Sequence, residues 1–281
     1  MKTVLVLEGG GMRGIYTAGV LDTLMENKIK IDVIIGVSAG ALFGVNYLSN
    51  QPGRAIRYNK KYLKNKNYMG FYSLLKTGEI MNKDFCFNKL VYELDVFDFE
   101  TFRKSKTEFY VTVTNIETGE AEYIPIKDLE KDMEYLRASG SMPLVSKIIE
   151  INGKKYLDGG IADSIPVEKA KQLGGHKIIV VQTRPIEYRK KPVNMLPYKI
   201  IYRKYPKLIE TIHNRYLQYN QTVENIINYE NKKEIFVIRP TKTIQIGRIE
   251  KNIQKVQEMY DLGKDNTNIK IKDLEQFIGE D

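Results

Sequence analysis

The chain has 281 residues, 42% hydrophobic and 28% charged, a composition that excludes a disordered or collagen-like protein. One cysteine and two histidines exclude an internal disulfide and a Cys/His zinc site, and they are typical of a protein from a reducing compartment. The formal net charge of +9 favours anionic partners such as lipid headgroups, nucleic acid or phosphorylated substrates.

The first 50 residues predict alternating strands and helices. Continuous apolar runs at 3–7 and 32–37 are typical of strands covered on both faces, and helices are expected at 12–26 and 39–48. This order predicts the start of a parallel α/β sheet with right-handed crossovers. The first residues are too few and too polar for a signal peptide, and no window reaches the ~20 apolar residues of a membrane span. We therefore expect a cytoplasmic protein.

The rest of the chain predicts a cationic helix, two hairpins and further helices and strands. Residues 54–66 interleave lysine and arginine with tyrosine, and residues 184–206 form a basic, proline-containing linker or surface lid. Hairpins are expected at 108–126 and at 147–157, where Asn152-Gly153 is typical of a type I′ turn. The remaining predicted elements are helices at 128–137, 166–173, 207–229 and 249–262, the last ended by Gly263, and strands at 177–183 and 234–239.

A glycine-rich motif, Gly9-Gly10-Gly11-Met12-Arg13-Gly14, directly follows the first strand and opens a helix. It permits close backbone approach, with N–H groups and the positive end of the helix dipole directed at an anion. A dinucleotide site is one interpretation, but the acidic residue that it needs, Asp32, stands at the start of the second strand rather than its end.

A second motif, Gly36-Val37-Ser38-Ala39-Gly40, lies between a predicted buried strand and a helix. Gly-x-Ser-x-Gly in this context indicates a nucleophile elbow, and the alternative is a turn of small residues packed under the helix. Both motifs should lie at the carboxyl edge of neighbouring strands. We therefore expect the Ser38 hydroxyl to attack a carbonyl while N–H groups around Gly10, Gly11 and Met12 stabilise the oxyanion.

The serine needs a base, and neither histidine fits. His176 should lie at the opposite, amino edge of the sheet, and His213 falls within a helix beside a core stripe. Asp158-Gly159-Gly160 offers a carboxylate, although Asp-Gly-Gly is also a common turn. Because aspartate is a weak base, direct proton abstraction requires a short Ser–Asp hydrogen bond in a partly desolvated site, and we expect low to moderate turnover.

These three motifs, in this order, resemble the patatin-like phospholipases over residues 4–183. The segments 137–143 and 158–167 and the tail with Arg248 are also similar to the family. The resemblance implies a three-layer α/β sandwich with a mostly parallel central sheet and a lipid acyl hydrolase without metal or cofactor. It implies Ser38 as the acylated nucleophile, Asp158 as the general base that later activates water, and the loop from Gly9 to Met12 as the oxyanion hole. Arg13 would hold this loop, meet a headgroup phosphate, or form a plain salt bridge.

The resemblance divides the chain into a catalytic domain at 4–183 and a basic, mainly helical extension at 184–281 that packs on it. It implies a phospholipid or lysophospholipid substrate, and we expect the basic, tyrosine-containing segments 54–66 and 184–203 to contact an anionic membrane at its inner face. The alternatives are a soluble-ester or thioester hydrolase with the same Ser38–Asp158 dyad and a non-catalytic phosphate or nucleotide binder. Nucleic-acid binding is not expected, because the basic residues mix with acidic ones and no recognition motif is found.

Overall fold

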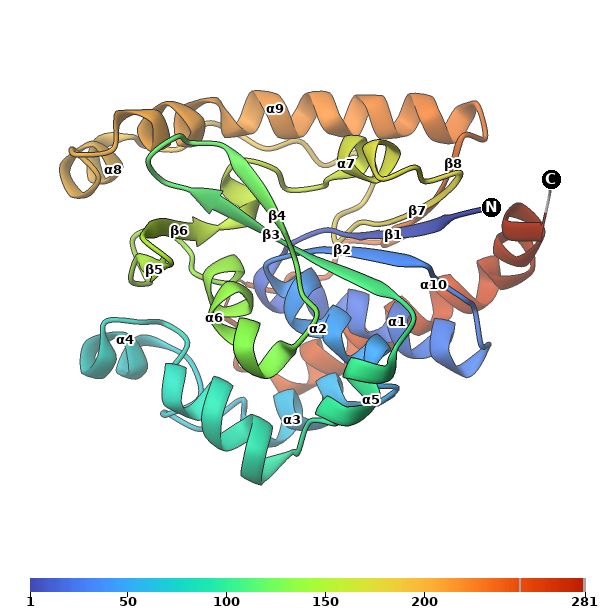
Figure 1. Ribbon diagram of the computed structural model, residues 1–281, viewed down its shortest axis with the longest axis horizontal. Helices are drawn as coiled ribbons and strands as arrows, with labels where there is room; N and C mark the ends of the chain where they lie inside the picture. Colours follow the sequence, from blue (N-terminus) through green and yellow to red (C-terminus); the bar gives the residue numbers. More distant parts are fainter. Residues whose placement is uncertain (248, 280–281) are drawn as a thin grey trace.

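A central sheet lies between two layers of helices in the computed structural model, which describes residues 1–247 and 249–279 (Figure 1). Arg248, which the family resemblance included, lies outside the described residues. The strand order is β5-β6-β3-β2-β1-β7-β8, with β4 also paired to β3. The parallel strands are β1 (Thr3–Leu7), β2 (Val33–Val37), β3 (Glu108–Asn115), β7 (Lys177–Val181) and β8 (Ile235–Ile238), and the antiparallel ones are β4 (Ala121–Pro125), β5 (Ile149–Ile151) and β6 (Lys154–Asp158). This mostly parallel α/β sandwich confirms the predicted fold class.

The central strands β1 and β2 bury both of their faces. Val4 and Val6 of β1 join one apolar cluster with helices α7 (Val167–Gln172) and α9 (Pro206–Asn231), which lie above the sheet in Figure 1. Leu5 and Leu7 point the other way, into a larger cluster with α1 (Ile15–Glu26), α2 (Ala39–Leu48) and α10 (Ile253–Gly279). This two-sided burial explains why β1 and β2 read as continuous apolar runs rather than as alternating ones.

Several shorter helices complete the two layers. The structure contains the predicted helices α3 (Arg54–Tyr62) and α6 (Leu129–Ser139). The helix predicted at 12–26 begins as the single 3₁₀ turn η1 (Gly11–Gly14) and continues as α1. The sequence did not predict the helices α4 (Phe71–Thr77), η2 (Asp84–Leu94), α5 (Phe99–Lys104) and α8 (Leu196–Ile201), nor the single turn η3 (Gly159–Ile161). The helix η2 is wound as a π-helix, a form that periodicity at 3.6 residues does not detect.

The prediction that Gly263 ends the last helix is wrong, because α10 continues to Gly279. Gly263 instead allows α10 to lie against α1. A Cβ on Gly263 would come within 2.2 Å of the Tyr16 carbonyl oxygen, and a Cβ on Gly19 of α1 would come within 2.2 Å of the Tyr260 carbonyl oxygen. Glycine disfavours a helix interior by about 1 kcal/mol, so this pair reflects the close crossing of two helices and not a helix end.

The carboxyl ends of the parallel strands face one end of the molecule. The chain starts at the right of Figure 1 and β1 runs leftward, so this edge lies at the left, where α4 and α8 also lie. Since β1 pairs in parallel with β2, the segments that follow these two strands emerge side by side at this edge. The antiparallel strand β6 pairs with β3 and ends there at Asp158.

The residues after 183 continue the same architecture. Strand β8 extends the sheet beside β7, and α10 lies along α1, where the Tyr260 hydroxyl donates a 2.6 Å hydrogen bond to Asp22. The division into two domains at residues 183 and 184 stays a prediction. Among the described helices, none has the length and apolar character needed to cross a membrane.

Candidate active site

Ser38 occupies a tight turn between β2 and α2. Its backbone has φ 53° and ψ −121°, a combination that non-glycine residues rarely adopt, and the residue is only 6% exposed. The flanking glycines are required by close packing: a Cβ on Gly36 would lie 2.5 Å from Ala41 Cα, and one on Gly40 would lie 2.5 Å from the Leu7 carbonyl oxygen. The predicted sharp bend at Ser38 is therefore present, and small residues on either side make it possible.

Asp158 meets Ser38 directly. The Ser38 hydroxyl donates a 2.7 Å hydrogen bond to Asp158 Oδ2, and the Gly160 N–H donates a 2.8 Å hydrogen bond to Oδ1. Asp158 is also 6% exposed. Gly159 lets the chain turn here, because a Cβ at this position would lie 2.1 Å from the Thr112 carbonyl oxygen. The structure thus joins the second and third motifs in one short, largely buried contact.

The glycine-rich motif packs against the same turn. A Cβ on Gly9 would come within 3.0 Å of Ser38 Cβ, and a Cβ on Gly14 within 2.6 Å of Ala39 Cβ. Gly11 has a positive φ of 57°, which favours glycine. The loop brings main-chain atoms beside the Ser38 side chain, as expected for neighbouring parallel strands.

The two histidines lie away from this contact. His176 is exposed just before β7, at the amino edge, where its Nδ1 accepts a 3.4 Å hydrogen bond from the Lys2 N–H. His213 is exposed on α9, and neither histidine lines a cavity that contains Ser38. Within residues 1–247 and 249–279, no group of three or more His, Cys, Asp or Glu side chains could hold a metal ion.

Supporting residues that the sequence did not predict fix the Ser38 turn and the glycine loop. The buried Ser139 hydroxyl accepts a 2.8 Å hydrogen bond from the Ser38 N–H and donates a 2.7 Å hydrogen bond to the Thr112 carbonyl. Glu8, just before the loop, accepts hydrogen bonds from the Thr183 N–H and from the Tyr219 hydroxyl. Ser139 lies within segment 137–143, which resembles the family, but no local pattern indicates its contact with a residue 101 positions away.

Two cavities of opposite character meet at Ser38. One is lined mainly by apolar side chains from α2, α3, η2 and α6 and includes Met12. The other lies beside Asp158 and is lined by the cations Arg13, Arg184, Lys190 and Arg215, with Glu8, Gly9, Gly10 and Gly160 among its other residues. An ester held at Ser38 could thus place an apolar part in one cavity and an anionic part in the other.

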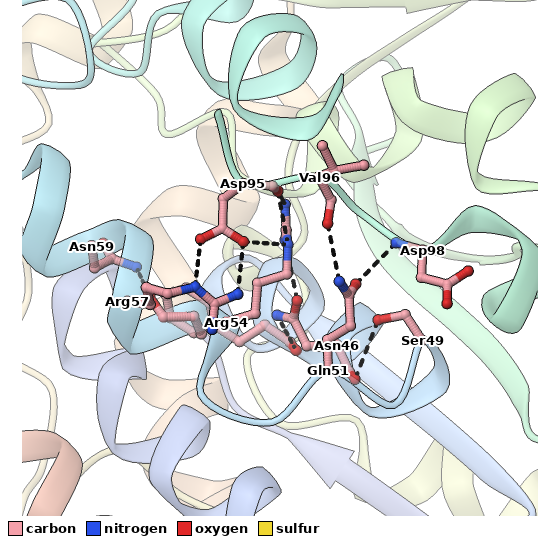
Figure 2. Close-up of polar contacts among 11 residues, drawn as sticks. Asn46, Ser49, Gln51, Arg54, Arg57, Asn59, Asp95, Val96 and Asp98 are labelled. Atoms are coloured by element: carbon pink, nitrogen blue, oxygen red, sulfur yellow. Dashed lines mark hydrogen bonds and ion pairs between the residues drawn. The ribbon is translucent and has the colours of Figure 1, made fainter. Parts of the chain in front are cut away.

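Arg54, which lines the apolar cavity, belongs to a largely buried ionic network (Figure 2). The Arg54 guanidinium lies 3.4 Å from Asp95 Oδ1 and donates a 3.1 Å hydrogen bond to Asn46 Oδ1. Arg57 donates to the same Asp95 carboxylate from the exposed side at 2.8 Å. Burial lowers the pKa of Arg54, and the Tyr58 ring and Asp95 oppose this shift. Arg54 and Tyr58 point inward and cannot make the membrane contact predicted for 54–66, whereas other cations of this segment remain exposed.

Comparison with known proteins matches two parts of the chain to family models. The model of the patatin-like phospholipase family matches residues 5–171, and a domain of unknown function, DUF6363, matches residues 205–279. The uncharacterized protein YjjU of Escherichia coli K12 is 27% identical over 94% of this chain and 75% of its own length. Lysophospholipase nte1 of Aspergillus niger is 33% identical over 65% of this chain, which spans only 12% of that protein.

Among solved structures, VipD from Legionella pneumophila aligns with 95% of this chain and 67% of its own, at 16% identity and a TM-score of 0.42. The family assignment rests on the sequence match to residues 5–171, which covers more than half of the chain. The chain therefore belongs to the patatin-like phospholipase family, a family of lipid acyl hydrolases.

Proposed function

We propose that this protein cleaves carboxylic esters of lipids, as a phospholipase A or lysophospholipase, through an acyl-enzyme on Ser38 with Asp158 as the general base. The observation that carries the proposal is the 2.7 Å hydrogen bond from Ser38 Oγ to Asp158 Oδ2. This distance lies within the range needed for direct proton transfer, and the bond forms in a site where both side chains are almost fully buried.

The reaction would follow two half-steps. Ser38 Oγ attacks the ester carbonyl as its proton passes to Asp158, and the loop N–H groups of Gly10, Gly11 and Met12 stabilise the tetrahedral oxyanion. When the intermediate collapses, the proton moves from Asp158 to the departing alcohol, and the acyl group stays on Ser38. Asp158 then takes a proton from water, which attacks the acyl-enzyme, and the proton returns to Ser38 Oγ as the fatty acid leaves.

The apolar cavity supports a lipid substrate over a small soluble ester. Its lining includes Met12, Leu42 and Phe43 beside Ser38, and it extends to η2 and α6. Burial of an acyl chain contributes about 0.8 kcal/mol per methylene, so a long chain would bind far better than an acetyl group. A soluble-ester or thioester hydrolase with the same dyad predicts the opposite preference, and hydrolysis of a micellar phospholipid and of a short-chain ester distinguishes the two.

The dyad is tested by lipid hydrolysis in the wild type, Ser38→Ala and Asp158→Asn. We expect each variant to lose activity by at least about 1000-fold, because both groups act in one step. Asp163→Asn is a matched control: this nearby carboxylate accepts a hydrogen bond from the Tyr123 hydroxyl, and the variant should retain activity. If both dyad variants remain active, the proposed mechanism is refuted.

We also propose that two exposed apolar helices dock the site on a membrane. Phe71 and Leu75 on α4 and Leu196, Ile200 and Ile201 on α8 are between 59% and 73% exposed. Both helices border the cavities at Ser38: Met69 and Ile80, on either side of α4, line the apolar cavity, and Tyr198 of α8 lines the cationic one. The exposed cations Lys199, on α8, and Arg203 and Lys204, just after it, add positive charge near these apolar side chains, a combination that fits an anionic lipid surface.

Binding to vesicles tests this docking surface in the inactive Ser38→Ala background. Ile200→Ser and Phe71→Ser should weaken binding to vesicles that contain phosphatidylglycerol, and added salt should weaken it further. Ile269→Ser, on α10, removes a side chain that is 78% exposed and should leave binding unchanged. Equal binding by all three variants would exclude α4 and α8 as the membrane contact. A cytoplasmic location, with contact at the inner membrane face, stays a prediction.

A further inference from the structure

Most of the cations that line the cavity beside Ser38 come from residues that follow the patatin-like match. Of its four cations, only Arg13 falls within residues 5–171, and Arg184, Lys190 and Arg215 come after them. We propose that this C-terminal part of the chain forms a phosphate-binding pocket for the alcohol side of the ester, so that acyl esters of glycerol phosphate are the preferred substrates. The inference rests on the proposed function of Ser38 and Asp158.

The charge balance of the cavity favours an anion. Four cationic side chains line it, against the carboxylates Glu8 and Asp158. Glu8 accepts hydrogen bonds from the neutral donors Thr183 and Tyr219. The excess of positive charge therefore lies next to the ester position, where a phosphate dianion or diester would be attracted.

Lys190 is held in place by α9. Its N–H donates a 2.7 Å hydrogen bond to Asn220 Oδ1, and the Asn220 side chain donates a 3.0 Å bond back to the Lys190 carbonyl. The ammonium donates a 3.0 Å hydrogen bond to Ser164 Oγ and lies 3.7 Å from the centre of the Tyr219 ring. A lysine held in this way loses little conformational entropy when an anion binds.

Arg215, on α9, places a second cation near Asp158 of the dyad. The point where a Cβ on Gly160 would lie is 3.3 Å from Arg215 Nη2 and 3.1 Å from Asp158 Oδ1. The guanidinium and the carboxylate therefore both lie beside Gly160, on the side where it has no side chain. In a glycerophospholipid the phosphate is separated from the acyl ester by the short glycerol unit, so an ester at Ser38 would place its phosphate within reach of Arg215 and Lys190.

The cavity continues outward along α9. Lys190 and Arg215 also line an adjoining cavity, together with the exposed Lys191 and with Tyr198 and Tyr216. This arrangement leaves room beyond the phosphate for a larger headgroup. The pocket would therefore select substrates by their phosphate more than by the headgroup attached to that phosphate.

The test compares two esters with the same acyl chain, lysophosphatidylglycerol and monoacylglycerol, both as monomers. Lys190→Gln and Arg215→Gln should each lower the ratio of kcat/KM for the phosphate ester to that for the neutral ester by about tenfold or more, mainly through KM. The control is Lys207→Gln. Lys207 is an exposed cation on α9, the helix that carries Arg215, and it pairs with Glu210. This substitution should leave the ratio unchanged.

An equal loss on both esters, or an unchanged ratio in both variants, would overturn the phosphate pocket. A second measurement separates the pocket from the dyad. Glycerol 3-phosphate should raise the Tm of Ser38→Ala and should not raise that of the double variant Ser38→Ala/Lys190→Gln. If Ser38→Ala remains active but this shift is seen, the proposed mechanism fails and the pocket stands. A Tm shift with inorganic phosphate, without any change in the ester ratio, would overturn the inference in favour of a free-phosphate site.

Discussion

The backbone strain at Ser38 can be measured by comparing Ser38→Gly with Ser38→Ala. Both variants remove the hydroxyl, so they share the loss of the hydrogen bond to Asp158 and differ only at Cβ. A non-glycine residue at φ 53° and ψ −121° carries about 1–3 kcal/mol of strain, which glycine relieves. Against this, glycine loses about 0.5–1 kcal/mol through unfolded-chain entropy and about 0.8 kcal/mol through the buried methyl group. At the middle of these ranges the glycine variant should be more stable than the alanine variant by about 0.5 kcal/mol.

Ser105 provides the matched pair, because it has an ordinary φ of −59° and ψ of 137°. There the glycine variant should be less stable than the alanine variant by about 0.5–1 kcal/mol. Urea unfolding gives each free energy of unfolding, and the difference between the two pairs should be about 1 kcal/mol, or roughly 2–4 °C in Tm. If glycine carries the same cost at both positions, the Ser38 turn is not strained and this reasoning is refuted.

Three further variants test the surroundings of the site. Ser139→Ala leaves the Ser38 N–H without its 2.8 Å acceptor and should lower both kcat and the free energy of unfolding, the latter by about 1–3 kcal/mol; an unchanged urea midpoint would contradict this. Asp95→Asn leaves the buried Arg54 guanidinium without its carboxylate and should lower stability by about 3 kcal/mol in urea, whereas a loss below about 1 kcal/mol would argue against the network. Burial raises the pKa of Asp163 above its usual 3.8, so the folded state holds this proton more tightly. Relative to Asp163→Asn, wild-type stability should therefore fall as pH rises through the raised pKa, and a constant difference in urea unfolding between acidic and neutral pH would refute the shift.

The parts of the fold that could be predicted from the sequence are those set by local patterns. Strands β1 and β2 are apolar on both faces. Gly36 and Gly40, which allow the turn at Ser38, lie within two residues of it in the sequence. Asn152 and Gly153 both have positive φ, as a type I′ turn requires. The sequence also predicted that Asp158 approaches Ser38, because the serine needs a base and neither histidine could reach it, and because the three motifs resemble those of the family.

The rest depends on contacts between distant segments. Gly263 resembles a helix end in sequence, but it lies inside α10 because α1 crosses there, and only the packed structure distinguishes the two cases. Arg215 and Lys190 occur in segments that resemble a solvated helix face and a linker, and they reach the site because α9 packs over the sheet. No periodicity indicates which of many surface cations is turned inward.

Labelling with a fluorophosphonate probe tests most directly whether Ser38 is a nucleophile activated by Asp158. We expect peptide mass spectrometry to find the phosphonyl adduct on Ser38 in the wild type, no adduct in Ser38→Ala, and a much slower reaction in Asp158→Asn. An adduct on another residue, or an equal rate in Asp158→Asn, would contradict the account, and a wild type that is never labelled would favour a non-catalytic binder.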